Sequence, residues 1–286
     1  MSPSVTMLAG VAGPLALREL AGNTSATDAV LIAHANGFHG GCYRAFAQAL
    51  DANVRVFALD FRGHGDSAAP TELDGFAWSG MTEDASTAVD HLVTLNLDRI
   101  HGFGHSLGGA ALIDLERQRP GTFTTLFAFE PVMAPKGPHN PDSPLTRSAE
   151  NRLRGFPSKA AALTRYAARP PLGWLQADVL FDYVDNGFEE QPDGSVTLKC
   201  LPENEAEIYR RAGQTVHLDT AAEVESVVVV GRSGDGGLPA QLAGPIVEKL
   251  SQGRLLDFPD LTHFGPLQDP VTVANVMRDL IETAAG

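Results

Sequence analysis

The feature of this sequence that most limits its possible folds is the alternation of short apolar runs with segments of helical length. The candidate strands are continuously hydrophobic, as expected for strands buried on both faces, and cover residues 29–35, 54–61, 99–104, 125–130, 226–231 and 254–259. Helical segments separate or follow them at residues 43–50, 81–95, 107–119 and 271–284. This alternation predicts an α/β fold with a mostly parallel, doubly wound sheet covered by helices.

The alternation stops between Pro131 and Ala221. Helical stretches such as "SKAAALTRYAARP" and "GWLQADVLFDYVDNGF" follow one another there without a buried strand between them. We therefore expect a core domain made of residues 1–131 and 222–286, interrupted by a helical cap, or lid, at residues 132–221. Such an insertion at the carboxyl edge of the sheet would cover the crevice in which open α/β sheets bind ligands.

Composition restricts the partners more than the substrate. A formal net charge of -14 over 286 residues argues against nucleic acid or an anionic membrane as a partner. Two cysteines, Cys42 and Cys200, are expected to be reduced thiols in a cytoplasmic protein. The sequence begins without the pattern of a signal peptide, and no apolar run approaches the roughly 20 residues that span a bilayer. None of these features indicates an oligomeric state.

The segment "GHSLG" (104–108) matches the pattern G-x-S-x-G, with Ser106 at its centre. A sharp turn between a strand and a helix exposes the hydroxyl of such a serine, and small neighbours let the strand and the helix approach each other. A candidate strand precedes this segment and a candidate helix follows it, as the motif requires. The context predicts that Ser106 is a nucleophile.

Other chemistries find less support in the sequence. The stretch "GFGHSL" begins like the dinucleotide fingerprint G-x-G-x-x-G, but Leu107 occupies its sixth position, and no Walker-type phosphate loop occurs. The nine histidines form no H-E-x-x-H pattern and no paired Cys–His spacing typical of a metal site. We therefore expect no metal and no organic cofactor.

Four segments occur in an order that is typical of one family. They are "LIAHANGFHG" (31–40), "LDFRGHGDS" (59–67), "GHSLGG" (104–109) and "LTHFGPLQDP" (261–270). Over nearly its whole length the chain resembles an alpha/beta-hydrolase, in which such segments form the oxyanion loop, an R-G-x-G-x-S turn, the nucleophile elbow and the loop of the catalytic histidine. The first segment departs from the family pattern, because Ala35 stands where a second glycine is more usual.

The resemblance implies an alpha/beta-hydrolase fold and a base for Ser106. His263 follows the last candidate strand, and the family's chain order of serine, acid and histidine also places the histidine last. The family's oxyanion hole uses the backbone N–H that follows the nucleophile, here that of Leu107, with a second N–H from the loop after the third strand. We assign this second donor to Asn36.

Two carboxylates compete for the role of orienting His263. Asp235 lies in a glycine-rich loop after the strand at 226–231, where most family members carry the acid. Glu130 ends the preceding candidate strand, where a subset similar to haloalkane dehalogenases and zearalenone lactonases carries it. A charge at a buried strand end is costly unless it is paired, and Pro131 is expected to restrict Glu130 to an extended backbone. We favour Glu130 and keep Asp235 as the alternative acid.

The sequence therefore predicts a serine hydrolase of a small to medium-sized apolar carboxylic ester or lactone. Aromatic residues of the insertion are expected to line its pocket, namely Trp174, Phe181, Tyr183 and Phe188. Dehalogenase and epoxide hydrolase chemistry is disfavoured, because those relatives carry aspartate where Ser106 stands. Carbon–carbon bond hydrolysis, thioester hydrolysis and perhydrolysis stay open, as does a slow ligand receptor on the same scaffold.

Overall fold

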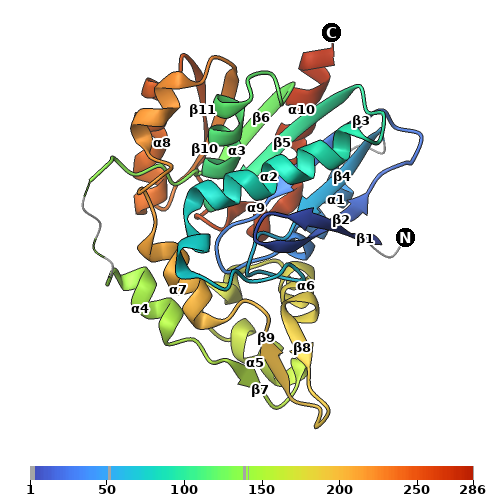
Figure 1. Ribbon diagram of the computed structural model, residues 1–286, viewed down its shortest axis with the longest axis vertical. Coiled ribbons are helices and arrows are strands. Elements are labelled where there is room, and N and C mark those ends of the chain that lie inside the picture. The colour runs from blue at the N-terminus through green and yellow to red at the C-terminus, as the bar shows by residue number, and fades with distance from the viewer. Residues whose placement is uncertain (1–3, 51–52, 138–139, 141, 286) are drawn as a thin grey trace.

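The core of the protein is an eight-stranded sheet, shown in Figure 1. The computed structural model describes residues 4–50, 53–137, 140 and 142–285. The remaining positions of the predicted core domain (1–3, 51–52 and 286) and of the predicted cap (138–139 and 141) lie outside the described residues. Within the sheet the strand order is β1-β2-β4-β3-β5-β6-β10-β11. The strands are β1 (Ser4–Gly10), β2 (Gly13–Ala21), β3 (Asp28–Ala33), β4 (Val54–Leu59), β5 (Arg99–His105), β6 (Thr125–Phe129), β10 (Val227–Ser233) and β11 (Gln252–Phe258).

The six strands predicted from continuous apolar runs are the parallel part of this sheet. Its two faces are covered by helices, with α2 (Trp78–Val93), α3 (Leu107–Gln118) and α8 (Leu238–Lys249) in one apolar core. The other core contains α1 (Arg44–Ala49) and α10 (Pro270–Ala285), and the short α9 (Gly265–Gln268) precedes α10. The doubly wound sheet predicted from the sequence is thus confirmed.

The hairpin of β1 and β2 was not predicted from the sequence. These two strands pair antiparallel with each other, and β2 pairs antiparallel with β4 at the edge of the parallel strands. Residues 4–7 of β1 are exposed, as suits an edge strand, so β1 lacks the buried apolar run that identified the other strands.

The segment between β6 and β10, here called the insertion (132–221), contributes no described strand to the main sheet. Its helices are α4 (Pro144–Glu150), α5 (Lys159–Ala167), α6 (Ala177–Gly187) and α7 (Pro202–Arg210), and 3-10 turns lie at η3 (Leu172–Trp174) and η4 (Leu218–Glu223). Besides the expected helices, the insertion contains a small antiparallel sheet of β7 (Gly155–Phe156), β8 (Phe188–Glu190) and β9 (Val196–Leu198), which the sequence did not predict. Strands of two or three residues are too short to show a sequence period.

The insertion gathers at one end of the main sheet, the lower end in Figure 1. There it contacts the loops that follow the parallel strands. The Asn36 side chain donates to the backbone oxygen of Glu205 in α7 at 3.1 Å, and the indole of Trp78 donates to Ile208 at 2.8 Å. Ala221 packs in the same core as α2 and α3, so the expected boundary after this residue falls inside η4 and not in a linker.

Candidate active site

Ser106 stands on the turn between β5 and α3 with a strained backbone. Its φ of 57° and ψ of -115° are unusual for a residue with a side chain. Close packing of backbone around the turn explains why small residues flank the serine. A Cβ atom on Gly108 would lie 2.1 Å from the backbone oxygen of Ala33, so only glycine fits there. The sharp turn keeps the Ser106 side chain partly accessible between two buried elements.

Ser106, His263 and Glu130 form a continuous hydrogen-bonded chain. His263 Nε2 lies 3.1 Å from Ser106 Oγ, and His263 Nδ1 lies 2.7 Å from Glu130 Oε2. A carboxylate only accepts hydrogen bonds, so Nδ1 carries the ring proton and Nε2 is left to accept from the serine hydroxyl. The arrangement can remove a proton from Ser106 and stabilise the imidazolium that results.

Glu130 is fully buried at the end of β6, and both of its carboxylate oxygens are engaged. Oε1 accepts the backbone N–H of Ser233 at 2.7 Å, while Oε2 faces His263. The backbone of Glu130 has a φ of 45°, so the extended conformation predicted from Pro131 is wrong. This left-handed turn directs the side chain out of the strand alternation and toward His263.

Asp235 also contacts His263, but through the main chain. Its Oδ2 accepts the backbone N–H of His263 at 2.8 Å, and its Oδ1 accepts that of Gly237 at 2.7 Å. Partial burial acts to raise the pKa of Asp235, but these backbone donors outweigh burial and lower the pKa below its usual range. The structure therefore brings both candidate acids to His263 and places only Glu130 at the ring.

The backbone N–H of Asn36, in the loop after β3, has no acceptor among the described residues. Within the described residues, the N–H groups of Ala35, Gly37 and Phe38 donate to Tyr43 Oη, His64 Nε2 and the Ala35 carbonyl, whereas no acceptor faces that of Asn36. The N–H of Leu107 is the first in α3, where no intrahelical carbonyl is available. These two donors suit an oxyanion.

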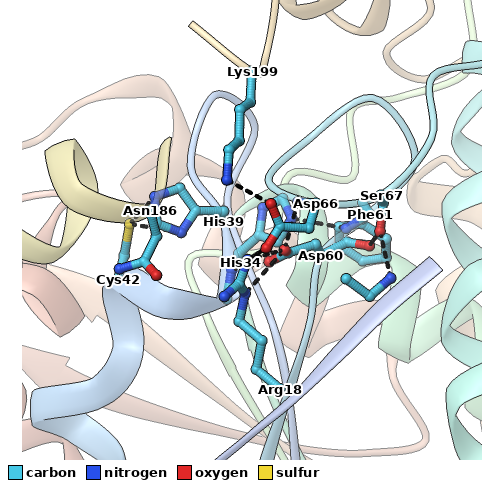
Figure 2. A network of polar contacts seen from close by, with 12 residues as sticks. Arg18, His34, His39, Cys42, Asp60, Phe61, Asp66, Ser67, Asn186 and Lys199 are labelled. Atoms are coloured by element: carbon cyan, nitrogen blue, oxygen red, sulfur yellow. Dashed lines mark hydrogen bonds and ion pairs between the residues drawn. The ribbon is translucent and has the colours of Figure 1, made fainter. Parts of the chain in front are cut away.

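Buried polar groups hold the loop after β3 in place. Asp60 at the end of β4 accepts Gly40 N–H at 2.7 Å and the Arg18 guanidinium at 2.8 Å. Figure 2 shows this carboxylate between Arg18 and Asp66, with Lys199 of the insertion reaching Asp66. Burial acts to raise the pKa of Asp60, but Arg18 and the hydrogen bonds outweigh burial and lower it. The network ties β2, the candidate oxyanion loop and the insertion together.

The structure does not bring together the four aromatic residues predicted to line a pocket. Trp174 and Phe181 are about half exposed, at 50% and 53%. Phe188 packs inside the insertion against Phe156, with ring centroids 5.7 Å apart. Tyr183 alone among the four reaches the loop after β3, where its ring lies 5.3 Å from that of Phe38.

Sequence reasoning did not identify several residues around the site. The ring of Phe38 also faces that of Phe264 at 6.0 Å, and Phe264 is the neighbour of His263. Arg152 forms an ion pair with Glu205 and donates to the Tyr183 hydroxyl. The aromatic residues lay within quoted motifs, which was a usable signal, whereas Arg152 carries no sequence pattern that marks it.

The described residues offer no support for two other kinds of site. Within the described ranges, no group of three or more histidine, cysteine, aspartate or glutamate side chains is placed to hold a metal ion. Among the helices that the structure describes, none combines the length and apolar character needed to cross a membrane.

A serine at a strand–helix turn, facing a histidine at the carboxyl edge of a largely parallel sheet, defines the class of alpha/beta hydrolases. The profile of the alpha/beta hydrolase family matches residues 30–276, and this chain belongs to that family. It is 26% identical over 248 residues to a monoacylglycerol lipase of Mycolicibacterium smegmatis, a match that covers 84% of this chain and 82% of the relative.

Solved structures resemble the whole chain at low sequence identity. A peroxisomal alpha-beta-hydrolase from Saccharomyces cerevisiae has a TM-score of 0.77 at 17% identity, with 99% of this chain and 87% of that chain covered. The enol-lactonase from Burkholderia xenovorans has a TM-score of 0.71 at 16% identity, with 97% and 100% covered. Similarity at this level shows the shared fold.

Proposed function

We propose that this protein is a serine hydrolase that cleaves a small to medium-sized apolar carboxylic ester or lactone through an acyl-enzyme on Ser106. The observation that carries the proposal is the hydrogen-bonded chain from Ser106 through His263 to Glu130, with distances of 3.1 and 2.7 Å. Relatives named as a lipase and a lactonase support ester or lactone bonds as the target.

The reaction follows from the groups in place. Ser106 attacks the carbonyl carbon while His263 Nε2 takes the hydroxyl proton, and Glu130 stabilises the imidazolium. The N–H groups of Asn36 and Leu107 bind the oxyanion that forms. His263 then protonates the leaving alcohol, and a water molecule that it deprotonates releases the acid and restores Ser106.

The substrate class rests on the walls of the site. The rings of Phe38, Tyr183 and Phe264 form an apolar group beside His263. Residues 132–221 act as a cap in this proposal, since α6 supplies Tyr183 and α7 packs against the loop of Asn36. Such a cap selects substrates by size and excludes water from the acyl-enzyme.

The proposal is tested with a panel of p-nitrophenyl esters, aryl lactones and aryl thioesters. Wild-type protein should hydrolyse short and medium acyl esters or lactones, and Ser106→Ala should lose this activity. Ser25→Ala, an exposed serine far from the elbow in sequence, is the matched control and should retain it. Equal turnover by Ser106→Ala, or turnover of thioesters alone, would contradict the proposal.

A further inference from the structure

A chain of three hydrogen bonds, two buried and one partly buried, connects the loop of Asn36 with the loop of His263. The backbone N–H of Ala35 donates to Tyr43 Oη at 3.3 Å. The same Tyr43 oxygen lies 2.8 Å from His105 Nδ1, and His105 Nε2 lies 2.8 Å from the backbone oxygen of His263. Tyr43 and His105 have no exposed surface. The chain thus leads from the candidate oxyanion loop, through the residue that precedes Ser106, to the candidate base loop.

Simple elimination gives the direction of each bond. The carbonyl of His263 only accepts, so His105 must carry a hydrogen on Nε2. Burial lowers the pKa of His105 well below its usual range, so the ring is neutral and Nδ1 is a bare acceptor. Tyr43, whose pKa burial raises, therefore donates its O–H to Nδ1 and accepts from Ala35. Each polar group has its required partner, which leaves one arrangement.

The elbow motif does not demand a histidine at position 105. The pattern G-x-S-x-G leaves this position free, and a buried imidazole is costly unless both ring nitrogens are bonded. His101 on the same strand shows the contrast, since neither of its ring nitrogens has a hydrogen-bond partner among the described residues. Both ring nitrogens of His105, by contrast, have hydrogen-bond partners, and these bonds connect two loops of the site. Packing alone does not explain such a connection.

We propose that Tyr43 and His105 are positioning residues that hold Asn36 and His263 in register with Ser106. This inference rests on the proposed function, because it assumes that the Asn36 N–H and the His263 ring act on the same carbonyl. The bond from Tyr43 fixes the peptide preceding Ala35, one residue before the oxyanion donor. The bond from His105 fixes the peptide that follows the base.

Loss of either residue should affect the chemical step more than substrate binding. A misplacement of about 1 Å in a catalytic group can lower the rate about 10²-fold. We expect kcat to fall about tenfold in Tyr43→Phe and by about 10–100-fold in His105→Leu, with KM nearly unchanged. His105→Gln should recover part of the loss, since its amide can still donate and accept.

The matched controls are Tyr166→Phe, which removes a phenol hydroxyl from the insertion, and His101→Leu, which removes a buried histidine from the same strand. Both should keep the wild-type kcat. The kcat of a Tyr43→Phe/His105→Leu double variant should be little lower than that of the worse single variant, because either substitution alone already interrupts the hydrogen-bonded chain. The melting temperature of each variant is measured first. If His105→Leu does not fold, the kcat values of Tyr43→Phe and His105→Gln test the inference instead.

Wild-type kcat in folded Tyr43→Phe and His105→Leu would overturn the inference, as would losses that multiply in the double variant. A rise in KM at constant kcat would also overturn it, because that result would place the residues in binding. Failure of the proposed function would look different. In that case Ser106→Ala would retain hydrolysis, whatever the behaviour of Tyr43 and His105.

Discussion

Asp235 contacts the backbone of His263, not its imidazole ring. Its carboxylate accepts the His263 N–H at 2.8 Å, while the ring nitrogen Nδ1 of the same residue lies 2.7 Å from Glu130. Two carboxylates that follow neighbouring strands thus contact one histidine in different ways. Asp235 holds the backbone of the loop, and Glu130 faces the ring.

Exchange of each acid for its amide should separate these roles. Glu130→Gln is expected to lower kcat about 10⁴-fold, because the ring loses the carboxylate that sets its tautomer and stabilises its charge. Asp235→Asn should cost far less, since an amide oxygen can still accept the backbone N–H of His263. Both variants must first be shown to be folded. If Asp235→Asn collapses kcat and Glu130→Gln does not, the assignment of the acid is wrong, and if both collapse, the two carboxylates share the role.

The elbow should tolerate substitution unequally at two adjacent glycines. A Cβ atom on Gly108 would lie 2.1 Å from the Ala33 backbone oxygen, whereas one on Gly109 would lie 3.0 Å from the Pro131 side chain. Gly108→Ala should therefore abolish activity or folding, and Gly109→Ala should keep a folded, weakened enzyme. Melting temperatures and ester hydrolysis check both. A fully active Gly108→Ala variant would contradict the close approach of α3 to β3.

The network in Figure 2 should be far more sensitive at its centre than at its rim. Asp60→Asn removes the buried partner of the Arg18 guanidinium and leaves it only the partly exposed Asp66, which should cost up to about 3–5 kcal/mol in the free energy of unfolding. Lys199→Met breaks a partly exposed pair with Asp66 and should cost less than about 1 kcal/mol. Urea denaturation measures both. Similar losses in the two variants would show that burial does not control the energetics here.

Stability should fall in acid, because several histidines are buried in neutral form. Burial lowers the pKa of His34 and His101 to about 4, and that of His64 to about 3. Since the folded-state pKa lies below the unfolded value of about 6.5, the unfolded chain binds protons first as pH falls. The free energy of unfolding should therefore decrease from about pH 6.5 down to these folded-state values.

His101→Leu provides the specific test of this pH dependence. The His101 ring is faced by Asp28, which raises its pKa, and by Arg99, which lowers it, and burial outweighs both. Its removal should make the slope of unfolding free energy against pH shallower by up to about 1.4 kcal/mol per unit. Urea midpoints between pH 4 and 7 measure the slope. An unchanged slope would mean that His101 does not titrate in this range.

The parallel part of the fold was predictable because buried strands of this kind are continuously apolar. β1 lacked that signal, since its residues 4–7 are exposed, and in β2 the charged Arg18 and Glu19 interrupt the apolar run. The insertion could be located by the break in alternation, but its three short strands were beyond any periodic pattern. The sequence therefore predicted those elements in which burial imposes an apolar pattern on several consecutive residues.

For the site, sequence identified the residues better than it identified their geometry. Ser106 and His263 could be located from motifs and chain order, and the acid could be narrowed to two strand ends. The choice between Glu130 and Asp235 depends on where a ring points relative to its own backbone, which no sequence pattern records. For the same reason the exposed Trp174 and Phe181 were assigned to a pocket, because aromatic composition does not give the direction of a side chain.

Acylation of Ser106 is the central step of the proposed reaction, and trapping the covalent intermediate tests it directly. Protein mixed with a p-nitrophenyl ester is quenched in acid within milliseconds to seconds, digested and analysed by mass spectrometry. We expect one acyl group, on the peptide that contains Ser106, which appears with the burst of p-nitrophenol and is absent from Ser106→Ala. An acyl group on another residue, or product formation with Ser106 unmodified at every time point, would contradict the proposed reaction.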